Sequence, residues 1–331
     1  MSTSRRWGVT EVEPARLHVL RPGLFTTVQD LGRWGFQRFG MPVGGAMDPF
    51  ALRCANRLVG NAASAAAQEV TVRGPELLFE RGAVIAVTGG EFDVSLDGNS
   101  VPGWTAVEVR PGSRLTIGER RSGARTYLAV AGGLNVPPVL GSRSTHVRSR
   151  TGGLGGRALA RGDVLGGRQP ASDAWDRIGR SVPTASRPAY SPSPTLRIVL
   201  GPQVEAFIPE AVDVLTQSRY VLTPQSDRMG YRLAGSPLVH AGSADLVSGA
   251  TPLGAIQVPA NRQPILLMAD RQTTGGYPKL AVAISADIPL AAQLLPGDMI
   301  RFAVVGVAEA QQILREQYRL LGGVLPPLGI P

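Results

Sequence analysis

The sequence predicts a β-dominated fold with only a few short helices. Glycine (41) and proline (27) make up about a fifth of the 331 residues, and helix interiors tolerate neither well. Short apolar runs bounded by turn residues recur along the whole chain, for example at residues 83–88, 126–131 and 280–284. Because 43% of the residues are hydrophobic, a chain of this length can fill about two domain cores.

Residues 183–195 separate the predicted strands into two groups. Prolines recur there among serine, threonine and alanine, a composition that is typical of an extended linker. We therefore expect a disordered tail at 1–15, an N-terminal β domain at 16–182 and a C-terminal β domain with a final helix at 196–331. A Pro-Gly turn precedes an apolar strand in each half. This is compatible with two similar barrels, although one shared turn type is common in β proteins.

Local signals mark individual strands and turns. Asp97-Gly98 between alternating segments predicts a tight hairpin. Gly89-Gly90 predicts a turn after the strand at residues 83–88. The further predicted strands are 92–96, 126–131, 196–200, 265–268, 280–284 and 299–305.

Two helices are predicted from their ends and spacing. Asp48 and Pro49 fit the N-cap and first turn of a helix that continues to about residue 59, where glycine follows. Apolar residues at helical spacing predict a second helix at residues 307–321.

The formal charge of +9 comes almost wholly from arginine, because Lys279 is the only lysine. Arginines gather at residues 114–125 and 143–168, but the second stretch contains no aromatic residue. A nucleic-acid surface would pair basic groups with aromatic rings for base stacking, so we expect no nucleic-acid partner. Some of the guanidinium groups are instead candidates for binding anionic ligands.

Composition also predicts the compartment. With Cys54 as its single cysteine the chain forms no internal disulfide, which is typical of a reducing environment. No apolar run follows the N-terminal arginines, and no stretch approaches the ~20 apolar residues that span a bilayer. We expect a cytoplasmic protein without a membrane partner.

Several common catalytic motifs are absent from the sequence. There is no nucleophile-elbow serine, paired-cysteine metal motif, helical zinc-protease pair or phosphate-binding loop ending in Gly-Lys-Ser/Thr. His18, His146 and His240 are far apart in the chain. We therefore predict no metal site, and no ATP site of the P-loop type.

Two polar clusters are candidates for anion binding. Arg143, Ser144 and Thr145 follow a permissive glycine, a pattern that suits an anion-binding concavity but also an ordinary Ser/Thr turn. Arg228 would clamp a carboxylate or phosphate with two parallel hydrogen bonds. The alternative for Arg228 is a surface ion pair with Asp227, which would contribute little.

The third cluster, residues 270–278, is the most informative. It lies between two predicted strands, and loops held by rigid strands often carry binding groups. Gly275 and Gly276 allow close backbone approach and a nest of N–H groups, while Tyr277 can stack on a planar ligand. The alternative is a flexible hairpin tip. The other candidate side chains in or beside this loop are Gln257, Asp270, Arg271, Gln272, Thr273 and Thr274.

Seven motifs occur in an order that resembles one known family. They are 28–33 (VQDLGR), 44–48 (GGAMD), 55–61 (ANRLVGN), 141–145 (GSRST), 227–230 (DRMG), 254–259 (GAIQVP) and 270–278 (DRQTTGGYP). Together they are similar to the allophanate hydrolase subunit 2 family, also called the biotin-dependent carboxyltransferase or Kip-antagonist family. The likeness runs from about residue 17 to residue 302.

The resemblance implies two cyclophilin-like β-barrel domains and a partner protein of the subunit 1 (Kip-inhibitor-like) type. For a free-standing member it implies an ATP-dependent 5-oxoprolinase that opens a lactam to L-glutamate. A lactam-utilisation-type protein would be a further partner, and ATP would bind through the complex. One alternative is biotin-dependent carboxylation of urea or allophanate-type substrates, with biotin on a separate carrier. Another is a non-catalytic regulatory partner of a Kip-inhibitor-like protein.

In the lactam-opening hypothesis an amide-like substrate gains negative charge, which hydroxyl and N–H donors would stabilise. Asp270 would act as a base or orient Arg271. The proposed catalytic residues are Asp270, Gln272, Thr273 and Thr274, and the proposed substrate-binding residues are Arg143, Ser144, Thr145, Arg228, Gln257, Arg271, Gly275, Gly276 and Tyr277.

Overall fold

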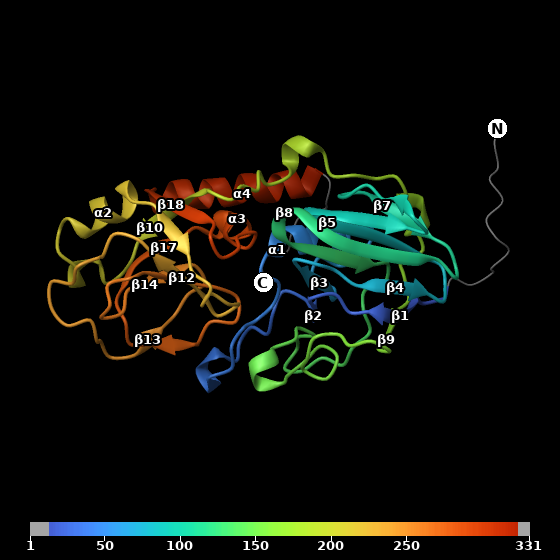
Figure 1. Ribbon diagram of the computed structural model, residues 1–331, viewed down its shortest axis with the longest axis horizontal. Coiled ribbons are helices and arrows are strands. Elements are labelled where there is room, and N and C mark those ends of the chain that lie inside the picture. The colour runs from blue at the N-terminus through green and yellow to red at the C-terminus, as the bar shows by residue number, and fades with distance from the viewer. Residues whose placement is uncertain (1–12, 324–331) are drawn as a thin grey trace.

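The computed structural model describes residues 13–323, which form two β-rich halves lying side by side (Figure 1). The first half is a curled sheet and the second is a closed barrel, so the prediction of a β-dominated fold is confirmed. No helix in this described range is both long and apolar enough to cross a membrane. Residues 1–12 of the predicted tail and residues 324–331 lie outside the described residues.

In the described part of the first half, nine strands form one sheet. Its main path runs β2-β3-β8-β4-β1-β9, and β5 pairs with β8, β7 and β6. Alternate residues such as Leu17, Val70 and Leu115 are fully buried in one core. The strands are β1 (Arg16–Arg21), β2 (Phe25–Gln29), β3 (Ala67–Thr71), β4 (Glu76–Phe79), β5 (Ala83–Leu96), β6 (Asn99–Ser100), β7 (Ala106–Val109), β8 (Arg114–Val130) and β9 (Val164–Gly166).

The strand β5 corrects one prediction. It is continuous over 14 residues, so the turn predicted at Gly89-Gly90 is wrong. The pairing of β5 with β8 shifts register here, which makes the two glycines an irregularity within a strand. Gly89 has φ +107°, and a Cβ on it would lie 2.7 Å from the Arg125 carbonyl oxygen. The hairpin predicted at Asp97-Gly98 is confirmed, because these residues join β5 to β6.

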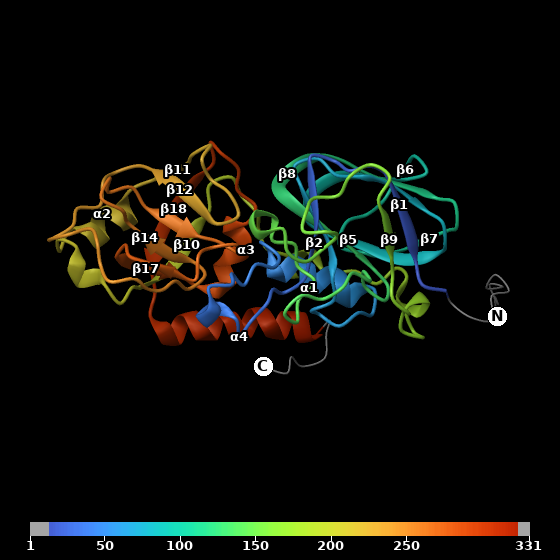
Figure 2. The same ribbon diagram turned by 90° about the horizontal axis from the view of Figure 1, so that it is seen from below.

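Both predicted helices are present. Helix α1 (Pro49–Leu58) begins after Asp48, whose Oδ1 accepts a hydrogen bond from the Ala51 N–H at 2.9 Å. Helix α4 (Val307–Gly323) runs along both halves (Figure 2), and Tyr318 packs against the core cluster that contains α1. Two shorter helices are α2 (Ala211–Gln217) and α3 (Ile288–Ala291).

The second half closes into a barrel of seven strands within the described residues, in the order β10-β17-β14-β15-β12-β11-β18. Leu196, Ile256, Leu280 and Phe302 belong to its core. A small two-stranded sheet, β13-β16, lies outside this barrel. The strands are β10 (Thr195–Leu200), β11 (Tyr220–Leu222), β12 (Gly230–Ala234), β13 (Gly249–Ala250), β14 (Ala255–Gln257), β15 (Ile265–Leu267), β16 (Thr274–Gly275), β17 (Lys279–Ala283) and β18 (Met299–Val304).

Each half contributes side chains to the other. Met47, from the first half, is 1% exposed and belongs to the core cluster of the barrel. Gln293, from the second half, accepts hydrogen bonds from the N–H groups of Ala124 and Arg125 at 3.0 and 2.9 Å. The predicted linker also packs here, because the Tyr190 hydroxyl donates to Asp48 at 2.6 Å. These contacts hold the two halves in one arrangement.

Candidate functional site

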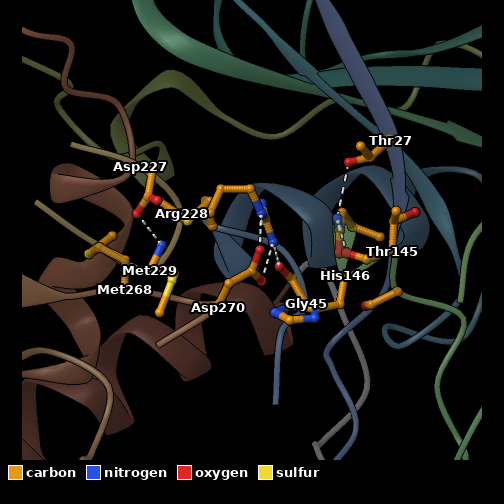
Figure 3. A network of polar contacts seen from close by, with 12 residues as sticks. Thr27, Gly45, Thr145, His146, Asp227, Arg228, Met229, Met268 and Asp270 are labelled. Atoms are coloured by element: carbon orange, nitrogen blue, oxygen red, sulfur yellow. Dashed lines mark hydrogen bonds and ion pairs between the residues drawn. The ribbon is translucent and has the colours of Figure 1, made fainter. Parts of the chain in front are cut away.

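A buried charged network joins the halves where the 270–278 loop begins. Arg228 donates from Nε and Nη2 to the two carboxylate oxygens of Asp270, at 2.8 and 3.0 Å (Figure 3). Its Nη1 donates to Glu69 on β3, and Nη2 also donates to the Gly45 carbonyl oxygen at 2.6 Å. Although burial acts in the opposite direction, the charges of Asp270 and Glu69 raise the pKa of Arg228. Arg228 therefore clamps carboxylates, as predicted, but they belong to the chain itself.

The carboxylate of Glu69 is fixed by neutral donors from the first half. Its Oε2 accepts from the Met47 N–H at 2.8 Å and from the Tyr127 hydroxyl at 2.7 Å. The same hydroxyl accepts from the Asp48 N–H at 2.8 Å. Gln293 Nε2 donates to Asp48 at 3.0 Å, and burial raises the pKa of Asp48 to about 6. Asp48 thus extends the polar network from Glu69 into the start of α1.

Arg33 lies on the other side of Asp270 and is 1% exposed. Its Nη2 donates to the Ser144 carbonyl oxygen at 2.5 Å, whereas its Nη1 has no hydrogen-bond partner among the described residues. Gly44 (φ +66°) faces this region, and a Cβ on it would lie 3.5 Å from both Arg33 Nη1 and Asp270 Oδ1. A buried donor without a partner is costly in a folded protein and is a frequent mark of a ligand site.

His146 lies near this pair (Figure 3) and is 5% exposed. Burial lowers its pKa, and this effect outweighs the opposing charge of Asp270, so the ring is neutral near pH 7. Its Nδ1 is 2.7 Å from the Ser149 hydroxyl. Sequence reasoning gave no role to Arg33 or Glu69 and treated His146 only as an isolated histidine. All three reach the site through tertiary contacts between distant segments.

The predicted cluster at residues 141–145 surrounds Asp30. The Ser142 and Ser144 hydroxyls donate to its Oδ1 at 2.6 and 2.5 Å, and the Arg143 N–H donates to its Oδ2 at 2.5 Å. This cluster therefore does hold an anion, but the anion is a side chain of the same protein. The Thr145 hydroxyl donates to the Val28 carbonyl oxygen at 2.9 Å, which anchors the loop to β2.

Arg271 points away from Asp270. Its Nε donates to the Thr251 carbonyl oxygen at 2.8 Å, and burial lowers its pKa to about 10. The hypothesis that Asp270 orients Arg271 is corrected here, because the Asp270 carboxylate pairs with Arg228. Consecutive residues at the start of the loop thus serve two different surroundings.

The remaining predicted residues of the loop meet on the outside of the barrel. Gln272 Nε2 donates to Gln257 Oε1 at 3.1 Å, and Gln257 Nε2 donates to the Tyr277 carbonyl oxygen at 3.3 Å. A Cβ on Gly275 would lie 2.7 Å from Gln257 Nε2, so this close approach requires glycine. Tyr277 is 40% exposed, and its ring is accessible to a ligand.

The tip of the loop is held by a neighbouring segment. Strand β16 pairs with β13, so that Thr274 lies opposite Ala250. The Leu246 N–H donates to the Gly276 carbonyl oxygen at 2.7 Å, and the Thr251 N–H donates to the Thr273 carbonyl oxygen at 3.1 Å. The structure therefore brings Gln257, Gln272, Gly275 and Tyr277 together, and it places Thr273 and Thr274 on the hairpin that covers them.

A separate groove of about 850 Å³ lies against β5 and β8 and is lined by residues that include Trp104, Arg121 and Tyr190. None of the predicted site residues lines this groove. Within the described range, no three His, Cys, Asp or Glu side chains are grouped as metal ligands would be. We therefore take the candidate site to be the network around Arg33 and Asp270 together with the adjoining 270–278 loop.

Comparison with known proteins defines the class to which this fold and site belong. Residues 39–304 match the family model described as carboxyltransferase domain, subdomain A and B. The chain belongs to this carboxyltransferase-domain family, and the family prediction is confirmed.

Curated relatives match over nearly the whole chain. The chain is 41% identical to the C-type subunit of 5-oxoprolinase from Escherichia coli (strain K12), over 92% of this chain and 96% of that protein. It is 34% identical to the urea amidolyase of Saccharomyces cerevisiae, but it spans only 18% of that protein. Among solved structures, the urea amidolyase of K. lactis superposes with a TM-score of 0.88 at 31% identity, over 97% of this chain and 21% of that one.

Proposed function

We propose that this chain is the C-type subunit of an ATP-dependent 5-oxoprolinase, which opens the lactam of 5-oxoproline to L-glutamate. The observation that carries the proposal is the buried guanidinium of Arg33, whose Nη1 faces the surroundings of Gly44 and Asp270 without a hydrogen-bond partner in the described residues. A guanidinium in such a dry position suits the carboxylate of 5-oxoproline. The full-length similarity to relatives named as this subunit of 5-oxoprolinase supports the same reaction.

The lactam end of the substrate would meet the glutamine pair. The Cα atoms of Asp270 and Gln272 are two residues apart, so at most about 7 Å separates them. A molecule the size of 5-oxoproline spans a comparable distance between its carboxylate and its ring carbonyl. In this proposal Gln272 and Gln257 orient the lactam amide, and the exposed hydroxyl of Thr274 donates to the oxygen that becomes negative. ATP is bound through the partner subunits.

The test is to assemble the chain with its subunit 1-type and lactam-utilisation-type partners and to measure L-glutamate formed from 5-oxo-L-proline with and without ATP. Arg33→Met is expected to reduce kcat/KM by about 100-fold or more, because a site built for a carboxylate loses its donor. Gln272→Ala is a second variant that leaves the buried arginines intact. Arg121→Met, at an exposed ion pair with Asp93, is the matched control. Absence of ATP-dependent glutamate from the complete wild-type complex would refute the proposal.

The second candidate is a carboxyltransferase that acts on urea with biotin supplied by another protein. The close superposition on the K. lactis urea amidolyase favours it. It requires urea-dependent turnover of a carboxylated biotin carrier, and avidin would abolish that turnover. The same assembled complex can be assayed with urea and a biotinylated carrier in place of 5-oxo-L-proline.

A further inference from the structure

Lys279, the only lysine of the chain, is buried on the barrel. It opens β17, and 5% of its surface is exposed. Its N–H donates to the Gln203 side chain at 3.2 Å, but its ammonium has no hydrogen-bond or ion-pair partner within the described residues. Lysine is seldom buried to this extent without a partner, because the ammonium loses its hydration.

The neighbours of Lys279 are neutral amides. Gln257 is its partner in the pairing of β14 with β17, and directly opposed residues project to the same face of a sheet. Gln257 is 1% exposed and bonds in turn to Gln272. The side chain that touches the backbone of Lys279 is also an amide, that of Gln203. The ammonium is therefore surrounded by groups that orient hydrogen bonds and do not neutralise its charge.

We propose that Lys279 binds a small planar oxyanion, a carboxylate or bicarbonate, on this outer face of the barrel beside Gln257. An anion brought by a ligand supplies the charge that the surroundings of the ammonium lack, and amide groups at its edge fix the plane of the ligand. The site is separate from the guanidinium of Arg33. It does not depend on the 5-oxoprolinase reaction, since bicarbonate and a substrate carboxylate share the chemistry that Lys279 recognises.

The first experiment uses thermal unfolding of the purified full-length chain at constant ionic strength. Sodium bicarbonate, 5-oxo-L-proline and inorganic phosphate are each added in place of sodium chloride. We expect bicarbonate or 5-oxo-L-proline to raise the Tm of the wild type, because a ligand that binds only the folded state stabilises it. The rise should be absent in Lys279→Met and unchanged in Arg121→Met. A rise that survives in Lys279→Met, or that only phosphate produces, overturns the proposal.

The second experiment needs no variant, so it stands even if Lys279→Met folds poorly. Reductive methylation with formaldehyde and a borane modifies lysine side chains and the N-terminal amine, and peptide mass spectrometry separates the two. We expect the protecting anion to slow methylation of Lys279 by about fivefold at four times its Kd, while the N-terminal amine reacts at the same rate. Equal rates at Lys279 with and without all three anions would overturn the proposal. Protection by bicarbonate alone would identify the ligand as inorganic, and protection by 5-oxo-L-proline would identify it as a substrate carboxylate.

Discussion

Replacing Arg228 by methionine tests the network between the two halves most directly. The change removes four hydrogen bonds and leaves Asp270 and Glu69, which are 7% and 0% exposed, without their cation. Removing one partner of a buried ion pair costs about 3–5 kcal/mol, because the remaining charge stays buried. We therefore expect Arg228→Met to lower the free energy of unfolding by that amount. The matched control Arg121→Met, whose ion pair with Asp93 is exposed, should cost less than about 1 kcal/mol.

The assay is denaturant unfolding followed by two signals. All four tryptophans precede residue 183, so their fluorescence reports the first half, whereas far-UV circular dichroism reports both halves. The two curves should coincide more closely in the wild type than in Arg228→Met. Adding Glu69→Gln removes one of the stranded charges, so the double variant should be more stable than the sum of the two changes by about 1 kcal/mol or more. An effect of Arg228→Met no larger than that of Arg121→Met would refute this account of the interface.

Three further predictions concern the network and the loop. The folded-state pKa of Asp48, about 6, lies above its ordinary value of 3.8, so folding takes up a proton between these values and this contribution to stability falls by up to about 3 kcal/mol as pH rises from 4 to 7. The free energy of unfolding of the wild type minus that of Asp48→Asn, measured at both pH values, should fall accordingly, and a constant difference would contradict the shift. Tyr190→Phe removes the hydroxyl that donates to Asp48 and should cost about 1–3 kcal/mol in urea unfolding; an unchanged midpoint would show that this bond is not needed. Gly275→Ala places a Cβ 2.7 Å from Gln257 Nε2 and should reduce glutamate formation by the complex about tenfold or more, whereas Gly166→Ala, with open space around its Cβ, should not; equal activities would exclude a role for this close approach.

The fold was predictable where local chemistry decides the structure. Asp48 and Pro49 start α1 by the capping rules, and Asp97-Gly98 makes a hairpin because both residues adopt positive φ. Gly89-Gly90 carries the same local signal for a turn. There the long pairing of β5 with β8 continues through the glycines, and only that non-local pairing distinguishes a strand irregularity from a turn.

The candidate site was predictable only in part, for the same physical reason. The loop from Asp270 to Tyr277 declares its polar groups within a few residues, so sequence found it. The partner of Asp270 could not be inferred from adjacency, which favoured Arg271 over Arg228. Likewise the carboxylate of Asp30 fills the serine cluster 112 residues further along the chain, a pairing with no local signal.

The position of Asp270 links the stability of the interface to the geometry of the loop. A buried ion pair is weak evidence for stability, since well-packed apolar residues often stabilise a protein as much or more. Such a pair does fix relative position, because a rotated or shifted interface would leave its charges unpaired. Arg228 binds Asp270 from within the second half and Glu69 across the interface, so both halves determine where the loop starts. Gln272 follows two residues later and meets Gln257. The network therefore fits a role in setting the distance between Arg33 and the glutamine pair, and its loss should change substrate binding even in molecules that remain folded.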